Sequence, residues 1–405
     1  MTDVKINVRS VKPGMFVSML DRPWLGTRFP LEGFLVESEE QIVELAALCQ
    51  TVHVDLGMGE APDPRLILHE SAVESAASRE ITELRDATYE EQSEFVEEFD
   101  AAIPICEKLS VRVGDVMRDL REGKDLDFES LKEGVNAMID SVMRNPDAFA
   151  FLIELRKKDI YAYRHSLATS VWAATFGRHL GLPRPKIEIL AQGGLLLDVG
   201  KSRLPLSLLN KAGRLDENEM DLMRTHVQLG LDILKTDRKV PAEVVSMVAT
   251  HHERYDGRGY PKGLKELEIP LYGRIAGIVD TYDALTSPRV YAKPMSPHGA
   301  VNVLYEWRDM DFQKELVEQF IQTVGIYPTG TLVELSTGEI GVVISLNGAR
   351  RLLPRVMILL DARKQPYAEF RELDLRHQAE DDEAITIRRG LPPGTHGIDP
   401  EDMFL

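Results

Sequence analysis

The sequence predicts a mainly α-helical protein with a small α/β domain at its N-terminus and a small β appendage at its C-terminus. Three observations support this fold class. Apolar residues alternate over short stretches near the N-terminus, as in strands. A long middle region repeats its apolar residues at helical spacing and is interrupted by glycine and proline. After Tyr327-Pro328 the pattern returns to that of short strands.

Composition limits both the number of domains and the classes of function. A chain of 405 residues is too long for one ordinary core, so two or three domains are expected. The formal net charge of −18 argues against a nucleic-acid polymer as partner, because binding the phosphate backbone of such a polymer needs a basic face. No run reaches the ~18 to 20 apolar residues of a membrane span. Two cysteines and no basic-then-apolar leader predict a cytoplasmic protein.

Residues 1–60 form the expected α/β domain. A strand, a turn at Pro13-Gly14 and a second strand are predicted between Val4 and Val17, with Val8 still inside the first strand. A short helix from Ile42 to Cys49 and a strand at residues 52–54 complete the unit.

The connecting segment and the central helices come next. Residues 61–104 are acidic, with scattered apolar residues, and are predicted to form a solvated linker or connecting helix. Residues 105–326 are expected to be the main helical domain. Its clearest helix carries one apolar stripe, formed by Leu131, Val135, Met138, Ile139 and Val142.

Residues 327–405 are predicted to form the β appendage. β-branched and other apolar residues gather into short runs separated by turn residues such as Thr337-Gly338. A loose tail is expected from Gly390. The predicted strands lie at residues 332–333, 340–346, 355–360 and 385–387.

Six polar residues of the helical domain stand out as candidate metal ligands. Imidazoles and carboxylates together suit zinc, manganese or iron without any thiolate. The six histidines outside this set are assigned no role, since a lone histidine is usually a surface or core residue. The candidate ligands are His165, Asp198, His226, His251, His252 and Asp280.

The adjacent pair His251-His252 follows the apolar helix at residues 244–249. Neighbouring side chains on a helix diverge by about 100°. The pair therefore suits two metals, or one metal near a helix end. A loop with several glycine and proline breaks, residues 253–261, comes directly after it.

These residues carry a resemblance to a known family. His251-His252-Glu253 through Gly259-Tyr260-Pro261 resembles the HHE-x-x-DG-x-GYP signature of the HD-GYP metallophosphohydrolases. Residues 1–60 also resemble the N-terminal domain of unassigned function that precedes many HD-GYP domains. Further matches occur in order at Arg164-His165-Ser166, Asp198-Val199-Gly200-Lys201, His226, Asp280-x-x-Asp283-Ala284-Leu285-Thr286-Ser287 and Arg289-Val290-Tyr291.

The resemblance implies an all-α HD-type metallohydrolase domain that holds two divalent metal ions, iron or manganese, and hydrolyses cyclic di-GMP to pGpG or GMP. One ion would be bound by His165, Asp198 and Asp280. The other would be bound by His226, His251 and His252, with the Asp198 carboxylate between the two ions. Asp198 and Lys201 take catalytic roles by this resemblance. The residues implied to bind substrate are Lys201, Gly259, Tyr260, Pro261 and Arg289.

Three positions depart from the family pattern. Leu197 stands where the histidine of the HD dyad should be, so the His165 site lacks one ligand and should hold its metal weakly. Tyr161 replaces the glutamate of the three-metal subgroup, so a third metal is not expected. Ala292 replaces the last basic residue of the phosphate-contacting stretch.

The departure at Leu197 leaves two functions open. One is an active or weakened cyclic di-GMP phosphodiesterase. The other is a catalytically impaired receptor or protein-interaction module. A nucleotide phosphohydrolase of the wider HD superfamily is a third interpretation that the GYP loop disfavours. The expected partners are cyclic di-GMP, diguanylate cyclase (GGDEF) domains bound through the GYP loop, and a second copy of the chain in a homodimer.

Overall fold

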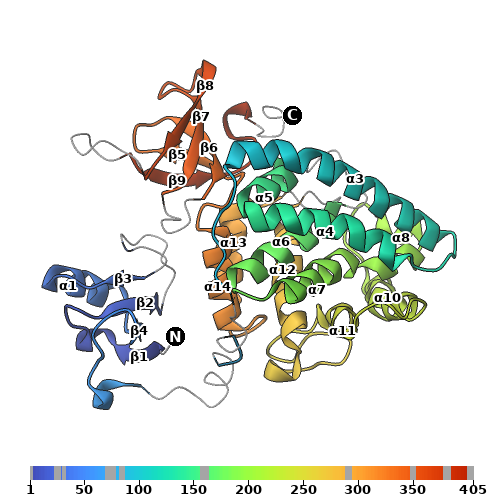
Figure 1. The fold of residues 1–405 in the computed structure, drawn as a ribbon, viewed down its shortest axis with the longest axis horizontal. Helices are drawn as coiled ribbons and strands as arrows, with labels where there is room; N and C mark the ends of the chain where they lie inside the picture. The colour runs from blue at the N-terminus through green and yellow to red at the C-terminus, as the bar shows by residue number, and fades with distance from the viewer. Residues whose placement is uncertain are drawn as a thin grey trace.

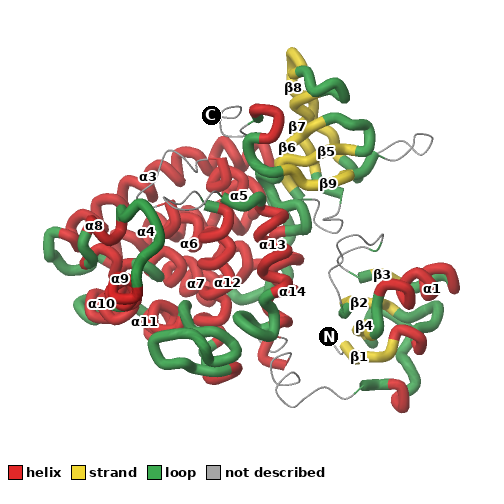
Figure 2. Tube along the Cα trace, turned by 180° about the vertical axis from the view of Figure 1, so that it is seen from behind, coloured by secondary structure: helices red, strands yellow, loops and turns green. Residues whose placement is uncertain are grey.

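The computed structural model describes residues 3–21, 29, 33–68, 79–81, 87–155, 164–287, 294–346, 353–376 and 385–398. This part of the chain is mainly helical, with one sheet before the helices and another after them (Figure 1). Figure 2 shows the strands as two separate groups beside the helical region. The expected fold class is confirmed. Of the helices that the structure describes, none has the length and apolar character needed to span a bilayer.

The N-terminal sheet is antiparallel, with strand order β1-β4-β2-β3. The Asn7 side chain accepts a hydrogen bond from the Arg9 backbone N–H, so the chain turns there and Val8 lies in a 3₁₀ turn instead of the expected strand. Ile67 forms a bridge with Ile6, which extends this unit past residue 60. Its elements are β1 (Asp3–Asn7), β2 (Phe16–Leu20), β3 (Phe34–Leu35), α1 (Glu39–Leu48) and β4 (Thr51–Asp55).

The connecting segment contacts the helical domain instead of lying wholly in solvent. Ile81 packs against the main core, and Glu80 Oε2 lies 2.5 Å from Nη2 of the buried Arg274. The first long helix begins at the buried Phe95 and continues across the boundary expected at residue 104. The connecting segment therefore contacts the helical domain at residues 80 and 81. The Glu80 carboxylate stabilises the buried charge of Arg274, which would be costly to bury without a partner.

The helical domain surrounds one large hydrophobic core. The predicted apolar stripe from Leu131 to Val142 is confirmed, since all five of its residues are buried on one side of α4. The helices are α3 (Phe95–Arg121), α4 (Phe128–Arg144), α5 (Pro146–Leu155), α6 (Arg164–His179), α7 (Arg184–Leu196), α8 (Leu206–Leu209), α9 (Glu217–Arg224), α10 (His226–Leu234), α11 (Ala242–Thr250), α12 (Leu271–Thr286), α13 (Pro297–Glu306) and α14 (Lys314–Val324).

Helices α6 and α7 lie unusually close together. A Cβ at Gly194 would be 2.6 Å from the Thr169 carbonyl oxygen, so only glycine fits there. Thr169 Oγ1 donates to the Gly194 carbonyl at 2.7 Å, and Ser170 Oγ donates to the Ala191 carbonyl at 2.7 Å. This contact brings the start of α6 near the end of α7, where the first candidate ligands lie.

The C-terminal sheet is antiparallel, with strand order β8-β7-β6-β5-β9. The expected loose tail from Gly390 is incorrect as far as residue 398, because Gly390 belongs to β9 and Ile398 is buried beneath the sheet. The sequence analysis also missed β8, which is exposed along most of its length. The strands are β5 (Leu332–Leu335), β6 (Ile340–Ser345), β7 (Arg355–Leu360), β8 (Pro366–Asp374) and β9 (Ile387–Leu391).

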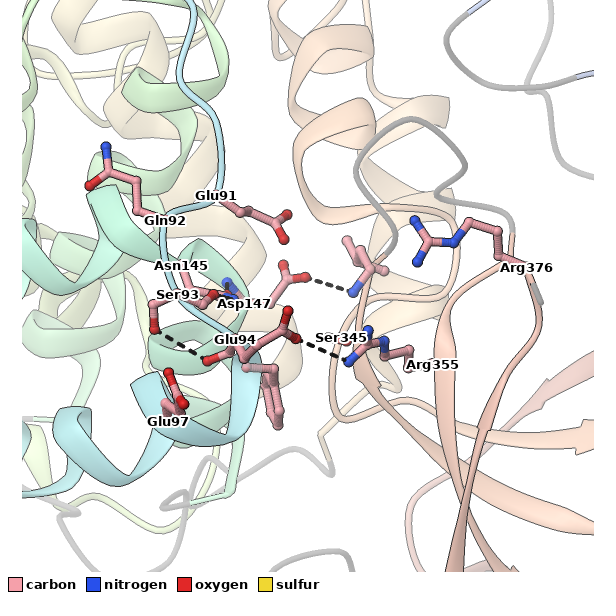
Figure 3. A pocket seen from close by; sticks show the side chains of 12 residues that line it. Glu91, Gln92, Ser93, Glu94, Glu97, Asn145, Asp147, Ser345, Arg355 and Arg376 are labelled. Atoms are coloured by element: carbon pink, nitrogen blue, oxygen red, sulfur yellow. Dashed lines mark hydrogen bonds and ion pairs between the residues drawn. The ribbon is translucent and has the colours of Figure 1, made fainter.

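The sheet and the helical domain share a hydrophobic core, in which Phe95 and Phe151 lie with Ile344 and other strand residues. Beside it is a crevice of about 440 Å³ (Figure 3). Asp147 Oδ2 accepts a hydrogen bond from the Leu346 backbone N–H at 2.6 Å across this crevice. The C-terminal sheet is thus held against α3 and α5 by apolar packing and a polar bridge.

Candidate metal centre

The structure brings the six candidate ligands together in two groups that share one residue. Within each group, one ligand atom from each residue lies within 4.8 Å of the others. Asp198 belongs to both, so its carboxylate lies between them. The first group is Asp198, His226, His251 and His252, and the second is His165, Asp198 and Asp280.

Two imidazoles of the first group each have a ring nitrogen available to bind a cation. Nδ1 of His226 lies 2.7 Å from the Met223 carbonyl oxygen, and Nδ1 of His251 lies 2.9 Å from that of Val248. Both contacts place the proton on Nδ1 and leave the Nε2 lone pair available. Each Nε2 is buried and has no hydrogen-bond partner among the described residues. Buried polar atoms normally have a partner, so this donor set fits a metal ion.

The pair His251-His252 serves one group because it lies just beyond a helix end. Helix α11 ends at Thr250, and the two imidazole centroids are 4.0 Å apart. Burial lowers the pKa of His251 to about 4 and also holds that of His252 well below its usual value. Both rings are therefore neutral at physiological pH, which is the form that binds metals.

His165 lies among three carboxylates, two of which, Asp198 and Asp280, belong to the second group. Its Nε2 is 3.2 Å from Asp198 Oδ2 and 3.0 Å from Asp280 Oδ1. Burial alone would lower the pKa of His165, but the hydrogen bonds with its carboxylate neighbours raise it well above the usual value. The ring thus carries a proton that a bound cation would replace, since positive charge is what these carboxylates favour.

Asp283, to which the sequence assigns no role, contacts the second ring nitrogen of His165. Its Oδ2 lies 2.6 Å from Nδ1 of His165, and its Oδ1 accepts a hydrogen bond from Arg164 at 3.2 Å. A carboxylate on the outer nitrogen of a ligating histidine fixes the orientation of the ring. The spacing could have indicated this, because Asp280 and Asp283 are three residues apart and share one face of α12.

Asp198 is positioned by a short 3₁₀ helix, η3 (Val199–Arg203), that follows α7. A Cβ at Gly200 would lie 1.9 Å from the His226 carbonyl oxygen, so the backbones of η3 and α10 touch directly. Lys201 Nζ lies 2.5 Å from Asp198 Oδ2. Burial by itself raises the pKa of Asp198, but Lys201 and the nearby histidines hold it well below the usual value.

Leu197 is fully buried in the main core beside Asp198. It offers no ligand atom, so the second group contains three ligands and the first contains four. By the family resemblance, a histidine at this position would add a fourth ligand to the second group.

The loop that carries the GYP residues is fastened to the centre by Glu253. The buried carboxylate accepts backbone hydrogen bonds from Lys262 at 2.8 Å and Leu264 at 3.0 Å. A Cβ at Gly259 would lie 2.3 Å from the Arg254 backbone nitrogen, so the loop closes tightly on itself.

Tyr260 contacts a candidate ligand, and Pro261 is exposed to solvent. The Tyr260 ring stacks on His252, with centroids 4.6 Å apart and an angle of 26° between the planes. Pro261 is exposed at the edge of the loop. Arg289, with Tyr161 and Ala292, lies outside the described residues.

Three family models match the chain. An HD domain matches residues 147–315, and a domain of unknown function (DUF3391) matches residues 3–131. A KOW domain associated with HD domains matches residues 332–380. The matches cover all three parts of the described fold.

Curated relatives and solved structures extend the comparison. A 3'3'-cGAMP-specific phosphodiesterase of Vibrio cholerae is 31% identical over 47% of this chain and 37% of its own length. A cyclic di-GMP phosphodiesterase response regulator of Xanthomonas campestris is 36% identical over 37% of this chain and 40% of its own length. The solved structure of a HDG"Y"P protein from Bdellovibrio bacteriovorus aligns with 78% of this chain and 98% of that chain, at 16% identity and a TM-score of 0.47.

One relative matches almost from end to end. A cyclic di-GMP phosphodiesterase of Pseudomonas aeruginosa is 34% identical over 384 residues, covering 94% of this chain and 91% of the relative. The residues matched by the HD domain model, 147–315, include all members of the two ligand groups. Together with the HD-domain match, this similarity shows that the chain belongs to the HD-GYP family.

Proposed function

We propose that this chain is a metal-dependent phosphodiesterase that hydrolyses cyclic di-GMP to pGpG or GMP. The main support is the pair of ligand groups joined at Asp198, with the buried Nε2 atoms of His226 and His251 available for a cation. The near full-length similarity to the Pseudomonas enzyme supports the choice of substrate.

The proposed ions are iron or manganese. His226, His251 and His252 would hold one with Asp198, while His165 and Asp280 would hold the other with the same carboxylate. Such a pair, when bound, supplies an activated water and neutralises negative charge on the phosphoryl oxygens.

The remaining polar residues orient the site and its substrate. Asp283 holds the His165 ring, and Lys201 provides a cation next to Asp198. Burial, together with the nearby carboxylates, raises the pKa of Tyr260, so its phenol keeps its proton and can donate a hydrogen bond to a phosphate oxygen. Gly259, Pro261 and Arg289 complete the proposed substrate-binding set.

The test is hydrolysis of cyclic di-GMP by the full chain loaded with manganese, followed by chromatography of the nucleotides. Activity should be lost in His252→Ala together with metal bound at the four-ligand group. Glu217→Ala is a suitable control, because Glu217 is exposed at the start of α9. Tight binding of cyclic di-GMP with bound metal and no hydrolysis would instead establish the receptor alternative.

Further parts of the proposal concern partners, location and domains. We propose diguanylate cyclase (GGDEF) domains as partners of the GYP loop, and a homodimer as the assembly. Cys49 and Cys106 are buried in two different cores, which supports a cytoplasmic location without a disulfide framework. The division at residues 60, 104 and 326 also remains a proposal, with the deviations described above.

A further inference from the structure

Planar side chains form a continuous path from the four-ligand group toward solvent. His252 lies beside His251, and the Tyr260 ring stacks on His252. The Arg224 guanidinium carbon lies 5.5 Å from the centroid of the Tyr260 ring. Arg224 is the last residue of α9, only two positions before the ligand His226. The path therefore ends in a guanidinium at the edge of the centre.

Arg224 has donors available for a ligand. Its side chain is 51% exposed, and among the described residues it forms an ion pair, 3.0 Å long, with Asp221, which is 72% exposed. Exposed ion pairs of this kind contribute little to stability, because water and salt screen the attraction between the two charges. A guanidinium has five N–H groups, so most of this fork can bind an anion while the group stays over Tyr260.

Three other cations of the described residues near the centre already have partners. Lys201 pairs with Asp198, and Arg164 pairs with the buried Asp283. Arg254 donates to backbone carbonyls and lies over Phe312. Arg224 thus combines proximity to the ligands with a half-exposed, weakly held charge.

We infer that Arg224 is a substrate-binding residue that contacts the phosphodiester of the cyclic dinucleotide that is not being cleaved. The inference rests on the proposed function, because it requires a substrate with two phosphodiesters. With one of them at the metal centre, the second must lie outside it. There a guanidinium provides a charge-assisted, two-point contact in a protein whose net charge of −18 otherwise repels the ligand.

The first measurement is equilibrium binding of the hydrolysis-resistant bis-phosphorothioate analogue of cyclic di-GMP to the metal-loaded full chain. Arg224→Ala should raise the Kd about 10-fold, and Arg224→Lys should raise it less, since lysine keeps the charge but not the fork. Arg371→Ala is the matched control. Arg371 is 58% exposed on β8 of the C-terminal sheet and pairs with Glu339, so its loss should leave the Kd within twofold.

The second measurement separates substrate contact from support of the site. Bis(p-nitrophenyl) phosphate has a single phosphodiester, so Arg224→Ala should leave its kcat/KM within about twofold and should retain the metal content of the parent. An equal loss for both ligands would overturn the inference, since Arg224 would then act by holding Tyr260 and His252. An unchanged Kd for the analogue would also overturn it.

The proposed function can fail separately. A parent that binds the analogue but does not hydrolyse cyclic di-GMP contradicts the phosphodiesterase proposal, while the effect of Arg224→Ala on the Kd still decides the inference. A parent that does not bind the analogue at all refutes both.

Discussion

Asp283 orients a ligand without belonging to either ligand group. It is fully buried, and its two oxygens contact different residues, His165 and Arg164. Replacing one oxygen by an amide nitrogen keeps the shape of the side chain but removes its charge. The amide has only one acceptor oxygen for His165 and Arg164, so it holds the proton on Nδ1 of His165 less firmly than the carboxylate does.

We therefore expect Asp283→Asn to weaken metal binding at the His165 group by about 10- to 100-fold while leaving the four-ligand group unchanged. Calorimetric titration with manganese should show that only the weaker step is lost. Asp232→Asn, an exposed change on α10, should leave both steps intact. Loss of both steps in Asp283→Asn would show that Asp283 supports the fold instead of one ligand.

Leu197 gives the second residue-scale prediction. In the parent, manganese should bind in two unequal steps, since the His165 group lacks the ligand that a histidine at position 197 would supply. Leu197→His should tighten the weaker step about 10-fold and raise hydrolysis of cyclic di-GMP. Equal steps in the parent would contradict this explanation.

The same substitution should cost stability when metal is absent. Leu197 is buried, and an imidazole without a partner there should lower the free energy of unfolding by about 1 to 3 kcal/mol. Added manganese should recover most of that loss. Thermal melts of both proteins with chelator and with manganese measure it, and a variant that manganese does not restabilise would show that the new ring does not reach the site.

At the scale of elements, Glu98 fastens α3 to α4. Its carboxylate accepts hydrogen bonds from Ser141 at 2.6 Å and from two nitrogens of Arg144 at 2.7 and 2.8 Å. Burial alone raises the pKa of Glu98, but these donors together hold it below the ordinary value of 4.5. A carboxyl group whose pKa is lower in the folded than in the unfolded protein stabilises the fold at pH values above its unfolded pKa. This contribution disappears as the pH falls through the folded pKa.

Glu98→Gln should therefore lower the free energy of unfolding by about 1 to 2 kcal/mol at pH 7. The difference from the parent should shrink as the pH falls below about 4.5, where the carboxylate of the parent begins to gain its proton in the unfolded chain. Urea unfolding at a series of pH values tests this. Glu97→Gln alters an exposed neighbour and should show neither effect. A difference that does not change with pH would exclude the charge as its source.

Elements with one buried face could be predicted from the sequence. The stripe of α4 is an example, because helical spacing alone places its apolar residues together. Strand β8 could not be predicted in this way, since seven of its nine residues are exposed. It forms because its backbone pairs with that of β7, the preceding strand, and backbone pairing leaves no pattern of apolar residues in an exposed strand.

The candidate ligands were predictable because a signature with fixed spacing contains them. The atoms that orient them were harder to foresee. The carbonyl groups of Met223 and Val248 set the histidine tautomers, and backbones carry no signal in residue type. Glu253 was visible in the signature, but its bonds to the loop backbone appear only after folding.

At the scale of the whole molecule, the C-terminal sheet and the helices depend on one another. Phe151 of α5 is fully buried in their shared core, where its ring lies 5.8 Å from that of Phe95. The sheet covers this surface, so loss of the sheet would expose a large apolar patch of the helical domain.

Phe151→Ala should lower the free energy of unfolding by about 3 to 5 kcal/mol. Because both parts use this core, calorimetry should show the unfolding of helices and sheet shifting together. Phe370→Ala, a change on the exposed strand β8, should shift it little. Two separate transitions, of which only one moves, would show that the parts unfold independently.

The shared carboxylate of Asp198 has a thermodynamic consequence. An ion in one group changes the charge and orientation that Asp198 presents to the other, so the two binding equilibria are linked. Linkage is reciprocal. If an ion in the first group changes the metal affinity of the second group by some factor, an ion in the second group changes the affinity of the first group by the same factor. The two groups should therefore fill as a coupled pair as the concentration of free metal rises. Protein that holds one ion will be scarce if the coupling energy is favourable and abundant if it is unfavourable.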